Sequence, residues 1–183
     1  MDSVLNPLYG YVYQFVPSVY CTMPQGVPAD VLRAEQDRLQ SRGYLPLEPF
    51  FILKEATVWD ERKNKPLELD RHRLEEIARV QNGRISQSGD FTPIIVGHTK
   101  RDQPEAAKQK PVGWASRFEV VEFGRNDDGR MIYGVLATPW AKAENRKYFE
   151  DHPRRSVEMW TDPFLIDPIS ILGATTPRLD LGL

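Results

Sequence analysis

Residues 154–173 read RRSVEMWTDPFLIDPISILG, and this pattern predicts two β-strands joined by a tight turn. Side chains two positions apart lie on the same face of a strand. The first strand therefore carries two sets of side chains: Ser156, Glu158 and Trp160 on one face, and Val157, Met159 and Thr161 on the other. A serine and a carboxylate opposite an apolar pair favour a polar setting such as a cleft, so Ser156 is a candidate functional residue.

The second candidate functional residue is His98, which follows the apolar residues 93–96 and a glycine. We expect it at the end of a buried strand, beside a surface loop at 99–111 that has no apolar periodicity. Strand ends that face loops often carry catalytic groups. The other two histidines, His72 and His152, are predicted on a helix surface and at a helix C-terminus, where a cation favours the helix dipole. From the residues alone a structural role for His98 is still favoured over a catalytic one.

Composition indicates one ordinary globular domain. Of the 183 residues, 40 % are apolar and 27 % are charged, which is typical of a protein with a packed core. The net charge of −2 gives no field that would draw the chain to nucleic acid or to an anionic membrane, and no apolar run is long enough to cross a bilayer. We therefore expect no nucleic-acid partner and no membrane contact.

Cys21 is the single cysteine, so no disulfide can form within the chain, and a buried small side chain is favoured over a nucleophile there.

Periodicity and turn residues predict the remaining helices and strands. Helices are expected at 29–41, 70–80 and 142–151, and further strands at 50–59, 93–97, 112–123 and 130–138. The second helix should end at Asn82-Gly83, and the last two strands should form a hairpin around 126–129, where Asn-Asp-Asp-Gly is strong turn chemistry. Strands with inserted helices predict an α+β fold on a mostly antiparallel sheet, closed or half-closed into a β-barrel. Residues 1–45 are expected to form an N-terminal arm and helix, and residues 46–183 the barrel domain.

A serine acts as a nucleophile only when a neighbouring base takes its proton and a third group orients that base. A strand serine is usually a partly buried structural hydroxyl, so Ser156 needs such partners. The Gly-x-Ser-x-Gly elbow is absent, which excludes the usual α/β-hydrolase arrangement. Arg154 and Arg155 precede Ser156 and are a source of positive potential for an oxyanion, although solvated arginines are the favoured interpretation.

Metal chemistry finds little support in the spacing of the possible ligands. No ligand motif such as His-Glu-x-x-His occurs among the candidates His98, Asp60, Asp102 and His152. We therefore expect neither a metal site nor a cofactor.

Five short motifs occur along the chain in a characteristic order. They are residues 58–62 (VWDER), 94–98 (IIVGH), 112–115 (VGWA), 156–158 (SVE) and 169–177 (ISILGATTP). By their order and spacing they resemble the prohead (capsid-maturation) serine proteases of tailed phages, of the Mu-like type. The resemblance covers residues 50–178, and residues 1–45 lie outside it.

The resemblance implies roles for four residues. His98 would be the general base and Ser156 the nucleophile. Some members of the family use an aspartate in the turn after the first strand, and Asp60 holds that position here, so it is the preferred third residue. Glu158 is the competing orienter, but two strand residues span roughly 6–7 Å, which suits the rim of a site better than a direct bond to the base. The arginine pair that supports the oxyanion in herpesvirus proteases has no match downstream of Ser156, which leaves the oxyanion hole unassigned.

The resemblance also implies a fold, an activity and partners. The fold would be similar to that of the herpesvirus assembly protease, with residues 46–183 as a protease-like barrel domain. The protein would be a serine endopeptidase that cuts scaffold and major capsid protein segments inside the assembling phage prohead, in the host cytoplasm. Because the herpesvirus enzymes act as dimers and residues 1–27 are rich in aromatic residues and proline, we expect a homodimer or a higher homo-oligomer. The alternative is a catalytically inactive structural or scaffold module of the phage head with the same fold.

Overall fold

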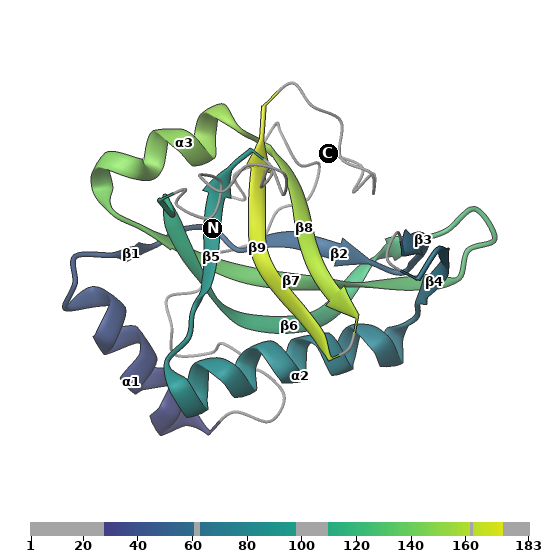
Figure 1. The fold of residues 1–183 in the computed structure, drawn as a ribbon, viewed down its shortest axis with the longest axis horizontal. Coiled ribbons are helices and arrows are strands. Elements are labelled where there is room, and N and C mark those ends of the chain that lie inside the picture. The colour runs from purple at the N-terminus through teal and green to yellow at the C-terminus, as the bar shows by residue number, and fades with distance from the viewer. Residues whose placement is uncertain (1–27, 61–62, 98–109, 162, 174–183) are drawn as a thin grey trace, which may run out of the picture.

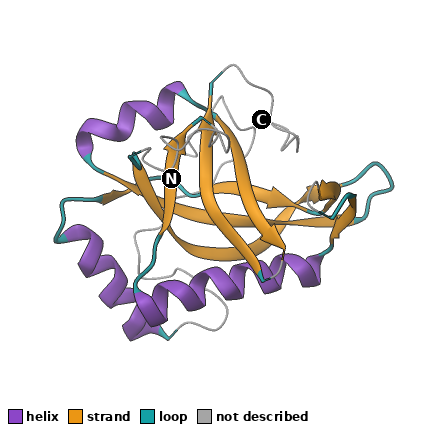
Figure 2. Cartoon of the chain, viewed as in Figure 1, coloured by secondary structure: helices purple, strands orange, loops and turns teal. Residues whose placement is uncertain are grey.

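The computed structural model describes residues 28–60, 63–97, 110–161 and 163–173 (Figure 1). Three features named above lie outside these residues: the N-terminal arm with Cys21, the histidine His98, and the loop residue Asp102. Within the described part, the chain alternates helices with strands of one large sheet (Figure 2). The predicted α+β class is confirmed.

The large sheet has seven strands in the described residues, in the order β1-β7-β6-β5-β9-β8, with β2 also pairing with β7. These strands are β1 (Leu45–Pro46), β2 (Phe50–Lys54), β5 (Thr92–Val96), β6 (Gly113–Arg125), β7 (Met131–Ala141), β8 (Arg154–Thr161) and β9 (Phe164–Leu172). Every pair is antiparallel except β5 with β9, which is parallel. A separate hairpin joins β3 (Ala56–Asp60) to β4 (Lys65–Leu69). The mostly antiparallel character was predicted correctly.

The expected closed barrel is wrong. Strands β5, β9 and β8 cross steeply over β2, β7 and β6, so the sheet folds back on itself (Figure 1). The two ends approach where the Arg155 guanidinium of β8 lies 4.5 Å from the centroid of the Phe50 ring of β2. No ladder joins β8 to β2 among the described residues. The sheet therefore stays open between β8 and β2.

Three helices accompany the sheet: α1 (Ala29–Gln40), α2 (Arg71–Ser88) and α3 (Arg146–Asp151), the last preceded by a short 3-10 turn, η2 (Ala143–Asn145). Helix α2 runs along one side of the folded sheet (Figure 1). Its Leu74 and Ile77 side chains are fully buried, in one core cluster with Ile94 of β5 and Phe118 of β6. Burial of one such side chain contributes about 1.5–3 kcal/mol, so the apolar face of α2 is a main stabilising contact of the fold.

The start of α2 was predicted correctly, and its end was not. Asp70 caps the helix, because its side chain accepts a hydrogen bond from the Arg73 amide at 2.8 Å. The expected stop at Asn82-Gly83 is passed, and the helix continues to Ser88, where Gly89 takes the left-handed conformation that ends it. The asparagine does not break the helix because its side chain is bonded to the sheet and does not compete for the helix backbone.

Two adjacent amide side chains of α2 bind the sheet at two of the points where its register shifts. Asn82 donates to the Phe118 carbonyl at 2.8 Å and accepts from the Phe118 amide at 2.9 Å, where the β6–β7 register shifts. Gln81 donates to the Ile166 carbonyl at 2.9 Å and accepts from the Ile166 amide at 3.3 Å, where the β8–β9 register shifts. A bulge leaves backbone groups without a ladder partner, and a buried group of this kind is costly. Gln81 and Asn82 supply the missing partners.

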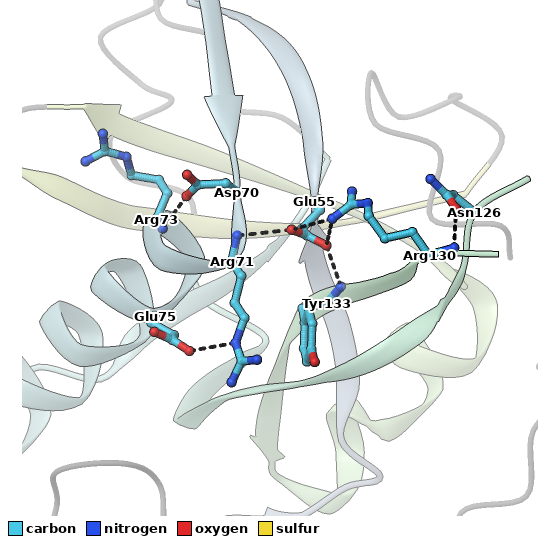
Figure 3. A network of polar contacts seen from close by, with 8 residues as sticks. All are labelled: Glu55, Asp70, Arg71, Arg73, Glu75, Asn126, Arg130 and Tyr133. Carbon is cyan, nitrogen blue, oxygen red and sulfur yellow. Dashed lines mark hydrogen bonds and ion pairs between the residues drawn. The ribbon is translucent and has the colours of Figure 1, made fainter. Parts of the chain in front are cut away.

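The single strand predicted at 50–59 is two strands, β2 and β3, which separate at Glu55. Figure 3 shows the Glu55 carboxylate between the first residue of α2 and strand β7. It accepts hydrogen bonds from the Arg71 amide at 3.2 Å and from the Tyr133 amide at 3.0 Å, and it lies 3.5 Å from the Arg130 guanidinium. Glu55 thereby attaches the bend between β2 and β3 to helix α2 and to strand β7.

The predicted hairpin at 126–129 is confirmed, with Asn126 accepting a hydrogen bond from the Arg130 amide at 2.8 Å.

Among the described residues, no helix has both the length and the apolar character needed to cross a bilayer.

Candidate functional site

Ser156 lies on β8 and faces away from the core. The alternation predicted for this strand is confirmed, because Val157 and Met159 pack against the core cluster while Trp160 is 47 % exposed. Ser156 itself is partly buried and pairs directly with Ser170 of β9. The face that carries Ser156 is thus distinct from the face that stabilises the fold.

A bulge in β9 leaves the alternation of β8 intact. Between the pairs Val157–Ile169 and Met159–Ile166, β8 advances by two residues (159 − 157) and β9 by three (169 − 166). The extra residue therefore belongs to β9, and Glu158 of β8 stays on the face of Ser156. Asp167 lies in the bulged stretch opposite Glu158. Partial burial raises the pKa of the Asp167 carboxyl, with Arg84 opposing the rise and the carboxylates of Asp90 and Glu158 adding to it.

The register of β5, β9 and β8 relates the strand before His98 to Ser156. The register aligns Ile95 of β5 with Ser170 of β9, and Ser170 with Ser156 of β8, so these three residues form one row across three strands. After β5 the Gly97 amide donates to the Ile171 carbonyl at 3.0 Å, which keeps the chain beside β9. The next residue, His98, lies outside the described residues.

The strands of the predicted base and nucleophile are not neighbours. For a hydrogen bond between His98 and Ser156 we expect the two residues on adjacent strands, and this expectation is wrong for the strand that leads to His98, because β9 lies between β5 and β8. At a strand spacing of about 4.8 Å, the Ile95 and Ser156 backbones are about 10 Å apart. Strand β9, with Ser170, therefore lies between the strand that leads to His98 and Ser156.

Asp60 is held at the far end of β8. It is 8 % exposed, and its carboxylate accepts hydrogen bonds from the Thr161 hydroxyl at 3.0 Å and from the Lys63 amide at 3.1 Å. Thr161 is five residues (161 − 156) along β8 from Ser156, which corresponds to roughly 17 Å, and its side chain lies on the opposite face of the strand. The structure does not bring Asp60 and Ser156 together.

Glu158 is the carboxylate that the structure does place beside Ser156. The two residues share one face of β8, two positions apart, and Glu158 is partly buried. Their separation of roughly 6–7 Å leaves room for a side chain between them that contacts both.

The two arginines before Ser156 have different surroundings. Arg155 is only 5 % exposed, so its expected solvation is wrong. Its guanidinium donates to the His152 carbonyl and, at 3.0 Å, to the Arg154 carbonyl, and it lies over Phe50. It therefore closes the end of β8 against α3 and β2. Arg154 is partly buried and shares the face of Ser156, so it is the arginine that can contribute positive potential there.

The other two histidines have the surroundings that the sequence predicts. His72 is exposed on α2. His152 ends α3, and its Nδ1 atom lies 2.9 Å from the Tyr148 carbonyl one turn earlier. In the described part of the chain, no group of three or more histidine, cysteine, aspartate or glutamate side chains is arranged to hold a metal ion.

Sequence reasoning overlooked Ser170. Its hydroxyl is fully buried and lies directly across from Ser156, in the run Ile169-Ser170-Ile171-Leu172. The signal was one serine between the apolar residues Ile169 and Ile171. No family model, no curated protein and no solved structure matches this chain. The surroundings of Ser156 are therefore the basis for a functional assignment.

Proposed function

We propose that the protein is a serine endopeptidase that processes scaffold and capsid protein segments during phage head maturation. One observation carries the proposal. Ser156 faces away from the core cluster, and the register aligns it through Ser170 with Ile95 of β5, three residues (98 − 95) before His98 in the sequence. The substrate class and the location inside the prohead rest on the resemblance of residues 50–178 to the prohead proteases. The mostly antiparallel, folded sheet is compatible with a fold like that of the herpesvirus assembly protease.

In the proposed mechanism, His98 takes the proton of the Ser156 hydroxyl while Ser156 Oγ attacks a peptide carbonyl carbon. The tetrahedral intermediate collapses when the C–N bond breaks, and the leaving amine receives the proton from His98. Water then attacks the acyl-enzyme with His98 again as the base, which releases the new carboxylate and restores the Ser156 hydroxyl. Arg154, on the same face of β8, supplies positive potential for the oxyanion.

Glu158 fits the role of the orienting carboxylate better than Asp60 does. Glu158 shares the face of Ser156 and lies two positions along β8 from it, roughly 6–7 Å away. Asp60 is bonded to Thr161 at the other end of β8. We therefore assign the orientation of His98 to Glu158, and to Asp60 the attachment of the β3–β4 hairpin.

Reaction with a fluorophosphonate probe tests the proposal, because such probes modify only activated serines. We expect the full chain to be labelled on Ser156, as mapped by peptide mass, and Ser156→Ala and His98→Ala to abolish labelling. Ser86→Ala, which removes an exposed serine on α2, is the matched control and should label like the unaltered protein. An unlabelled chain that also fails to cut capsid and scaffold segments would refute the protease and support the inactive structural module. Labelling that persists in Ser156→Ala would refute the assigned nucleophile.

A further inference from the structure

Ser170 is a buried hydroxyl without a partner. It is 0 % exposed, and its Oγ atom makes no hydrogen bond within the described residues. Another buried serine, Ser116, shows the usual arrangement: it is 2 % exposed and accepts a hydrogen bond from the Trp140 indole at 2.9 Å. Buried hydroxyls are generally satisfied in this way, because burial without a partner costs free energy. Ser170 is an exception that needs a physical reason.

The surroundings of Ser170 would suit an apolar residue. Its strand neighbours Ile169, Ile171 and Leu172 are all 3 % exposed or less, and so is Ile95, its partner on β5. An alanine here would lose no hydrogen bond and would avoid the burial of an unsatisfied hydroxyl. Among the described residues nothing bonds this hydroxyl, which points to a role in a state other than the resting one.

The position of Ser170 indicates what that role is. It lies on β9, between the strand that leads to His98 and the strand of Ser156, and it is the direct cross-strand partner of Ser156. Directly opposed residues have Cβ atoms about 4.5–5.5 Å apart, so rotation about χ1 brings two serine hydroxyls within hydrogen-bond distance. Catalytic hydrogen bonds are often loose in a free enzyme and tighten in the complex.

We propose that Ser170 is a positioning residue for the nucleophile, whose hydroxyl donates a hydrogen bond to Ser156 Oγ as that atom loses its proton. The inference rests on the proposed protease function. As His98 withdraws the proton, negative charge grows on Ser156 Oγ, in a place where Ser170 and Ile95 are shielded from water. A hydroxyl donor at that point stabilises the charge and holds the oxygen toward the incoming carbonyl. Ser170 itself gains and loses no proton.

Two substitutions at Ser170 test the proposal, because each should separate the effect on thermal stability from the effect on the rate of labelling at Ser156. Ser170→Ala removes the unsatisfied hydroxyl, so we expect the melting temperature to hold or to rise by about 2–4 °C. The rate of fluorophosphonate labelling at Ser156 should nevertheless fall by about ten- to a hundredfold, the factor for a lost hydrogen bond to a charged group. Ser170→Thr keeps the hydroxyl but adds a methyl group to a packed site. It should melt lower and yet label within about threefold of the unaltered protein.

Ser116→Ala is the control for a buried serine whose role is structural. It removes the partner of the Trp140 indole, so it should lower the melting temperature and leave the labelling rate of the folded protein unchanged. The inference is overturned if Ser170→Ala labels at the unaltered rate, or if the labelling rates of the two Ser170 variants simply follow their stabilities. If the unaltered protein is not labelled at all, the protease assignment fails and this inference fails with it.

Discussion

The Asp60 carboxylate accepts a hydrogen bond from the Thr161 hydroxyl at 3.0 Å, across 101 residues of sequence. This contact ties the end of the β3–β4 hairpin to the end of β8, because Asp60 is the last residue of β3 and Thr161 the last residue of β8. It also keeps Asp60 away from Ser156. A carboxylate expected to orient the catalytic base is thus occupied in holding two parts of the fold together.

The two carboxylate candidates should respond differently to loss of charge. We expect Asp60→Asn to lower the free energy of unfolding by about 1–3 kcal/mol, because it disturbs a buried bonded carboxylate, with little effect on the labelling rate of the folded protein. Glu158→Gln should slow labelling by at least about a hundredfold, since a base held in the wrong tautomer cannot accept the serine proton. Urea unfolding and labelling rates measured on both variants give the comparison. The reverse order would return the orienting role to Asp60, and mild effects of both would indicate a dyad of Ser156 and His98.

Glu35 should make the stability depend on pH. Its side chain is 6 % exposed on α1, and burial raises the pKa of its carboxyl from 4.5 to about 7, with Arg117 and Arg38 opposing the rise. A raised carboxyl pKa means that the folded state binds more protons than the unfolded state between pH 4.5 and about 7, so its contribution to stability falls as the pH rises through this window.

Glu35→Gln should remove this dependence. We expect it to melt about 2–4 °C above the unaltered protein at pH 8 and no higher at pH 5. Calorimetry across the range measures the difference, and Glu144→Gln, which changes an exposed carboxyl, should melt like the unaltered protein at both pH values. A Glu35→Gln variant that is less stable at pH 8 would show that the charged carboxylate is satisfied.

The amide of Asn82 should be a major stabilising group. Its side chain serves both backbone groups of Phe118 at the β6 bulge, so Asn82→Ala leaves a buried amide and a buried carbonyl without partners. We expect the free energy of unfolding to fall by about 2–4 kcal/mol. Urea unfolding measures it, with Gln87→Ala, an exposed change on the same helix, as the control. If both variants lose the same stability, the amide does not secure the bulge.

Self-association is expected to involve residues 1–27, which lie outside the described residues. They carry aromatic side chains at positions 9, 11, 13, 15 and 20 with little hydrophobic periodicity, and such surface is stabilised by contact with a partner or with the protein's own sheet. Sedimentation of the full chain should show a dimer, and deletion of residues 1–27 should weaken it. A full chain that stays monomeric at high concentration, like its truncated form, would refute the oligomer without affecting the chemistry of Ser156.

Local patterns in the sequence were sufficient for the elements whose conformation depends on near neighbours. The hairpin at 126–129 follows from its turn residues, which bond to one another within four positions. The start of α2 follows from Asp70 and an amide three residues later. The two faces of β8 follow from the geometry of any strand, and Ser156 was found on the polar face for that reason.

Features that depend on distant residues could not be predicted in the same way. Helix α2 passes through Asn82 because that amide bonds to Phe118, 36 residues away, and Asp60 is bonded to Thr161. Arg155 meets Phe50 across the two ends of the sheet, 105 residues apart in the sequence (155 − 50). The pairing of Ser170 with Ser156 depends on the register of β9, which a bulge shifts. Strand periodicity assigns a side chain to a face, but only packing over the whole chain selects its neighbours, because those neighbours come from segments that are remote in the sequence.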